Sequence, residues 1–132
     1  MQNKQYEEMM KALSQDAVKF ARVEFERELD FSIESLPVID AIVDSVKQKF
    51  ASQLTDDKVV FTLSNMLGAY CGEVYIQHIG GNWLIEEADT DKNLVYVQDG
   101  DKTFPFPGIV YLNLVSDDKK SISEYFSLAV DK

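Results

Sequence analysis

The sequence predicts a single α+β domain over residues 1–132. Three N-terminal helices pack on a small antiparallel sheet, a β-hairpin with a short third strand, and one or more helices follow it. Apolar residues recur at three- and four-residue steps through the first part of the chain, which is typical of helices. The period then changes to two between residues 83 and 98, which is typical of strands. With 132 residues, 45% of them hydrophobic, the chain is long enough for one packed core.

The first two helices are predicted from their apolar stripes. Residues 5–26 place apolar side chains along one helical face. After a break in the period, a second helix starts near Ser32 or Ser35, because either hydroxyl could accept a hydrogen bond from an unpaired backbone N–H. Pro37 favours the start at Ser35, since proline is tolerated in the first turn of a helix.

The third predicted helix begins at Asp56-Asp57, where negative charge suits a helix N-terminus, and stops at Gly80-Gly81. Apolar or small side chains occupy two opposite sides of it, so we expect a central helix covered on both faces. Gly68 and Gly72 would let one neighbouring element approach closely. Each glycine costs roughly 1 kcal/mol of helix propensity.

Alternating apolar residues predict two strands, 83–87 and 94–98, joined by a hairpin loop at 88–93. A third short strand is expected at 102–104. Residues 105–108 contain two prolines, and each removes a backbone donor, so this segment is not a central strand.

The C-terminal part of the chain is predicted less sharply. Residues 109–115 are compatible with a strand or a short helix, and Pro107 favours the helix. A last helix is expected to be capped by residues 116–118. Its inward-facing residues are Ile122, Tyr125, Phe126 and Ala129.

Composition excludes several classes of function. The formal net charge is −10 and the pI is about 4.4, which argues against direct binding of nucleic acid or anionic lipid. One cysteine excludes an intrachain disulfide and a Cys-based zinc cluster, and one histidine excludes a multi-His metal site. The N-terminus lacks an apolar signal-peptide core, and residues 59–79 carry too many polar side chains for a membrane span. We therefore expect a cytoplasmic protein.

Two patterns that resemble functional motifs fail on spacing. Residues 89–93 imitate the start of an EF-hand loop, but Leu94 and Gly100 stand where that loop needs glycine and a bidentate glutamate. Cys71 and His78 lie seven residues apart on one predicted helix, a separation of roughly 10 Å, which exceeds hydrogen-bond reach. The sequence thus predicts no catalytic residues, no metal site and no cofactor.

Glu73 is the only Asp, Glu, Lys or Arg in the stretch 59–85. A buried carboxyl group needs a partner. The partner could be backbone N–H groups near Gly80-Gly81, or Arg22, Arg27 or a lysine. The alternative interpretation is functional, with Glu73 as a general base or ligand anchor in a pocket.

Acidic residues cluster in two stretches. Residues 86–101 hold six carboxylates against one lysine, and residues 24–34 hold five against one arginine. Such clusters are typical of a solvated face, but they also suit a landing surface for a basic protein, which would make association fast and salt-dependent. Tyr96 or Trp83 would be an aromatic anchor if exposed. The predicted partner-binding residues are Glu86, Glu87, Asp89, Asp91, Asp99, Asp101 and Tyr96.

Three segments, Leu29–Leu36, Gly68–Val74 and Gly80–Trp83, resemble a set of small bacterial proteins with the pattern LDxSxxSL…GAYxGEV…GGxW. The resemblance covers residues 29–130. These proteins are mostly catalogued as domains of unknown function, and some occur near polymorphic-toxin systems. The resemblance therefore implies an immunity role by association and supplies no catalytic residues. The matching residues with an expected structural role are Gly68, Gly72, Glu73, Gly80, Gly81 and Trp83.

Three functions are compatible with these observations. The first is an acidic, non-enzymatic protein that neutralises a basic partner, most concretely an immunity protein for a nuclease-type toxin. The second is a housekeeping domain with a small-molecule or enzymatic pocket around Glu73. The third is a subunit of a stable complex, which a large exposed apolar patch would indicate.

Overall fold

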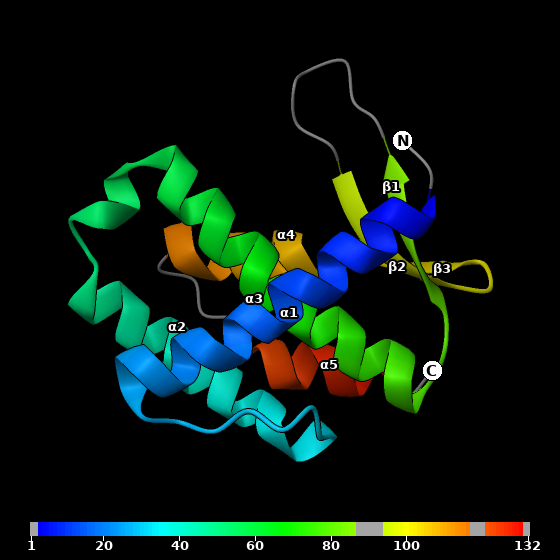
Figure 1. Ribbon diagram of the computed structural model, residues 1–132, viewed down its shortest axis with the longest axis horizontal. Coiled ribbons are helices and arrows are strands. Elements are labelled where there is room, and N and C mark those ends of the chain that lie inside the picture. The colour runs from blue at the N-terminus through cyan, green and yellow to red at the C-terminus, as the bar shows by residue number, and fades with distance from the viewer. Residues whose placement is uncertain (1–2, 87–93, 117–120, 131–132) are drawn as a thin grey trace.

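In the computed structural model of the protein, which describes residues 3–86, 94–116 and 121–130, the helix α3 (Asp57–His78) runs through the middle of the molecule (Figure 1). All residues from 66 to 75 on this helix are buried. The described residues form five α-helices and one three-stranded antiparallel sheet, so the α+β class is confirmed. The predicted central position of the third helix is confirmed as well.

Two helices precede α3 in the chain. α1 (Asn3–Phe25) crosses over α3 and packs on it, and α2 (Leu36–Lys49) follows after a loop and the short 3-10 helix η1 (Ile33–Ser35). A second 3-10 helix, η2 (Gln53–Thr55), leads into α3. The start of α2 after Ser35 agrees with the prediction.

The predicted caps of these helices have mixed outcomes. Asp56 caps α3 as expected, because its Oδ1 accepts a hydrogen bond from the backbone N–H of Lys58 at 2.9 Å. Ser35 makes no capping hydrogen bond at the start of α2, so that part of the prediction is wrong. Its hydroxyl donates instead to the carbonyl oxygen of Ser32 and shares a hydrogen bond with the Tyr70 hydroxyl.

The sheet has the strand order β1-β2-β3, with β1 (Asn82–Glu86), β2 (Leu94–Asp99) and β3 (Lys102–Phe104). In the register of β1 with β2, Trp83 pairs with Val97, and both side chains are buried against the helices. All three strands agree with the predicted ones to within one residue at each end. The predicted hairpin loop at 88–93 lies outside the described residues.

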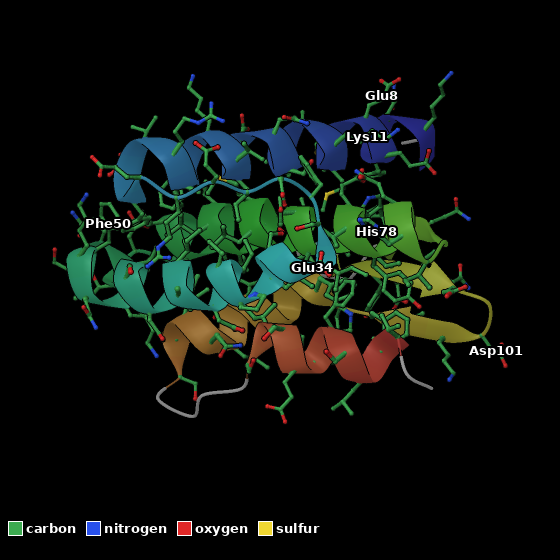
Figure 2. The ribbon with its side chains drawn as sticks, turned by 90° about the horizontal axis from the view of Figure 1, so that it is seen from below. Glu8, Lys11, Glu34, Phe50, His78 and Asp101 are labelled. Carbon is green, nitrogen blue, oxygen red and sulfur yellow. The ribbon has the colours of Figure 1, made fainter. Side chains whose placement is uncertain are left out.

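Two helices complete the fold after the sheet. The segment 109–115, for which Pro107 favoured a helix over a strand, is helical and belongs to α4 (Phe106–Val115). The helix begins three residues before the predicted segment, because Pro107 lies inside its first turn. α5 (Ile122–Val130) packs on α2 (Figure 2).

The last helix, predicted to be capped by residues 116–118, begins at Ile122. Ser116 ends α4 and does not cap α5, and residues 117 and 118 lie outside the described residues. Asp40, on α2, accepts hydrogen bonds from the backbone N–H groups of Ile122 and Ser123 at 2.6 and 3.1 Å. A carboxylate from another helix thus satisfies the first donors of α5, where it also meets the positive end of the helix dipole.

Gly68 and Gly72 each face a different neighbour. A Cβ atom at Gly68 would lie 2.4 Å from the Cα atom of Pro107 on α4, and one at Gly72 would lie 2.1 Å from the indole ring of Trp83. The predicted close approach is therefore confirmed, but two elements use it rather than one.

α3 has the length and the mean hydropathy, 1.2, that membrane-spanning helices reach, contrary to the polarity inferred from the sequence. However, 72% of its most apolar window is buried inside the protein. Contacts with the surrounding helices and sheet account for this apolar composition.

Replacing Gly72 by alanine should lower the free energy of unfolding by about 1–3 kcal/mol, because the methyl group overlaps the Trp83 ring and overpacks the core. Trp83 is the only tryptophan, so its fluorescence in urea reports this unfolding directly. Gly108→Ala is the matched control, since a Cβ atom there meets only Pro105 Cβ at 3.6 Å. It should raise stability by about 0.5–1 kcal/mol, and equal losses at both sites would contradict the packing argument.

Candidate functional site

Glu73 is buried in the middle of the fold and binds the only tryptophan. The indole N–H of Trp83 donates a hydrogen bond to Glu73 Oε2 at 2.8 Å. The neighbouring Gly72 leaves the space that the indole ring fills. The sequence did not indicate this partner, and Arg22, one of the expected ones, forms an exposed ion pair with Glu28 instead. The contact joins α3 to β1.

The loop between α1 and α2 is held on α3 by polar contacts of its backbone. Phe31 donates its backbone N–H to the Tyr70 hydroxyl at 2.8 Å, and its carbonyl oxygen lies 2.9 Å from His78 Nε2. Its ring also packs on the Tyr70 ring, with centroids 4.7 Å apart. Phe31 has a φ of 62°, a conformation that costs a bulky residue about 1–2 kcal/mol, so these contacts hold the loop in one shape.

The turn between β2 and β3 is held on the same helix. Tyr75 donates its hydroxyl to Asp99 Oδ2 at 2.7 Å. Burial, the hydrogen bond to Asp99 and the negative charge of Asp99 together raise the pKa of Tyr75 to about 12. Tyr75 thus keeps its proton at neutral pH and continues to donate to Asp99.

Each of the two acidic stretches is therefore tied to the C-terminal end of α3 at one point. His78 contacts the loop carrying the first stretch and Tyr75 contacts the turn carrying the second, and these anchors lie one helical turn apart. We call residues 26–34 and 99–102 together the acidic face. It holds six carboxylates against one arginine and one lysine.

Most carboxylates of the acidic face extend into solvent. Glu26, Glu28, Asp30, Glu34 and Asp101 are exposed, while Asp99 is half-buried. Glu28 pairs with Arg22 at 3.1 Å, which leaves the pKa of that carboxyl lowered by the hydrogen bond and the positive charge. Hydrogen bonds from the Ser32 hydroxyl and backbone N–H lower the pKa of Asp30 in the same way.

The predicted partner-binding residues fall into three groups. Asp99 and Asp101 belong to the acidic face, and Glu86 is exposed at the end of β1. Tyr96 lies half-buried on β2. Three further predicted residues, Glu87, Asp89 and Asp91, lie outside the described residues.

A separate pocket of about 770 Å³ opens between α1, α3, α4 and β2. Phe61 and Tyr111 form an aromatic wall with their rings stacked, centroids 5.4 Å apart. Tyr6 and Met10 line it from α1, and Tyr96 lines it from β2. Glu73 is not among the described lining residues, so this pocket differs from the one that the sequence placed around Glu73.

The described residues that line the pocket include no Asp, Glu, Lys, Arg, His or Cys. Within the same part of the chain, no three His, Cys, Asp or Glu side chains lie close enough to hold a metal ion. Cys71 is fully buried, and burial raises the pKa of its thiol far above the ordinary value.

Little in the amino-acid pattern indicated the pocket. Its walls come from four elements that are distant along the chain, so no local pattern marks them. The apolar stripe at Tyr6 and Met10 was visible, but it was indistinguishable from an ordinary core face.

Glu73→Gln and Glu73→Ala should both express and should differ in stability. Glutamine keeps an accepting oxygen for the Trp83 N–H, so Glu73→Gln should lose little stability. Alanine leaves that buried donor unpaired and should cost about 1–3 kcal/mol. Thermal unfolding with Trp83→Phe as the reciprocal variant checks this, and unchanged melting temperatures in both Glu73 variants would show that the contact does not anchor β1.

Alkaline pH should weaken the fold through Tyr75. Its pKa is raised from an ordinary value of 10 to about 12, so its stabilising effect is complete below pH 10 and is lost as the pH rises towards 12. Urea unfolding at pH 8 and pH 11 should show a larger loss for the wild type than for Tyr75→Phe. Asp99→Asn should bring the Tyr75 pKa part of the way back, as measured by tyrosinate absorbance, and an unchanged pKa would contradict the assignment.

Comparisons with protein-family models, with curated proteins and with solved structures found no significant match. The resemblance to bacterial proteins of unknown function therefore stays a prediction.

Proposed function

We propose that the protein is a non-enzymatic binding protein that recognises a basic protein partner through the acidic face. The most concrete form of this proposal is an immunity protein that neutralises a nuclease-type bacterial toxin. The observation that carries it is the anchoring of both acidic stretches on one turn of α3, by His78 and Tyr75.

The chemistry of a nuclease suits such a partner. Its substrate site binds phosphates with lysine and arginine side chains, and exposed carboxylates in fixed positions can occupy that site in their place. The exposed Glu34 and Asp101 come from segments that are both held by hydrogen bonds, so little entropy is lost when they meet a partner.

Charge reversal on the acidic face tests the proposal. The probe is the product of the gene directly upstream, co-expressed and purified as a complex. Glu34→Lys with Asp101→Lys should lower the association rate roughly tenfold at about 50 mM NaCl, and the difference should shrink at about 500 mM.

A matched control keeps the net charge change the same. Glu8→Lys with Asp16→Lys reverses two exposed carboxylates on α1. Glu8 stands on the outer side of that helix, away from Glu34 and Asp101 (Figure 2). These control variants should bind nearly as fast as the wild type. The proposal would be contradicted if the upstream gene product were unrelated to toxins and no complex were recovered at low salt. It would also be contradicted if the two double variants lowered the association rate equally.

A further inference from the structure

We propose that the pocket between α1, α3, α4 and β2 is a binding site for a small neutral molecule with an aromatic body and one amide-like polar group. The site is separate from the acidic face and does not depend on the proposed partner. Its volume, about 770 Å³, lies within the range of pockets that enclose small organic ligands.

The walls determine the body of the ligand. The stacked Phe61 and Tyr111 rings offer a flat apolar surface, and Met10 on α1 and Pro107 at the start of α4 add apolar contacts. Such a surface gains most from a flat ring that removes apolar area from water.

The charge of the walls determines the charge of the ligand. The described lining residues carry no formal charge, whereas the whole chain carries −10. An ion entering this pocket would lose hydration without gaining a counter-charge from any of these described residues, which is costly. A neutral ligand does not bear that cost.

Asn65 determines the polar group. Its side chain lines the pocket and has no hydrogen-bond partner within the described part of the chain. In that part, every fully buried side-chain nitrogen or oxygen has a partner, so the Asn65 amide is open to the pocket rather than sealed in the core. A carboxamide offers both a donor and an acceptor, which matches an amide on the ligand.

Three one-ring probes test this assignment on the purified protein. Acetanilide carries a ring and a neutral amide, ethylbenzene carries the ring alone, and benzoate carries a ring and a negative charge. Backbone amide NMR should show shifts at Leu13, Asn65 and Tyr111 with acetanilide, weaker shifts with ethylbenzene, and none with benzoate.

Two variants locate the site and its polar group. Gly108→Leu places a side chain in the pocket wall at an exposed position where a Cβ atom has room, so it should abolish binding. Ser127→Leu on α5 adds the same side chain at an exposed position outside the pocket, and it should leave binding unchanged. Asn65→Leu should weaken acetanilide roughly fivefold to tenfold and leave ethylbenzene bound, since it removes one hydrogen-bonding group.

Melting temperatures confirm that the variants are folded, and Thr62→Trp, at the exposed rim, serves as a second blocking variant if Gly108→Leu is unstable. Three results would overturn the proposal: equal shifts with benzoate, shifts that persist in the blocked variants, or no shifts at millimolar probe.

Discussion

The central helix α3 must be covered on all sides, and the rest of the structure follows from this requirement. Its residues from 66 to 75 are all buried, so no face of that segment is left for solvent. A helix that is apolar all round is stable only inside a protein or a membrane. Helices α1 and α4 and the sheet supply this cover, and Gly68 and Gly72 let two of these elements approach the α3 backbone directly.

Three polar side chains in the buried part of α3 connect it to the segments that surround it. Tyr70 holds the loop at Phe31, Glu73 holds Trp83, and Tyr75 holds Asp99. Each contact joins residues that are 10 to 39 positions apart, so it fixes tertiary position rather than local structure. Because a buried polar group without a partner is costly, each contact also disfavours other packings of the same segments.

The parts of the fold that could be predicted are those that depend on neighbours along the chain. The helical period, the cap at Asp56 and the stop at Gly80-Gly81 are local, and the structure agrees with all three. One acceptor at the start of α5, Asp40, was missed because it lies 82 positions before Ile122, whereas the other, the Ser121 hydroxyl that accepts from the backbone N–H of Glu124, is local. The partner of Glu73 was missed for a related reason. In a hydrophobic pattern, tryptophan counts as an apolar residue like any other, so the pattern does not mark its indole N–H as a hydrogen-bond donor.

The candidate sites differ in how they depend on charge, and that difference explains why they can share one small protein. The acidic face acts at a distance, since its field attracts a basic partner before contact and weakens with salt. The pocket acts only at contact, through apolar area and the Asn65 amide. The field of a chain with charge −10 repels anions from the pocket mouth, while a cation drawn towards it finds no described carboxylate in the walls to replace its water. A neutral ligand is indifferent to this field, so occupation of the pocket and attraction of a basic protein do not compete electrostatically.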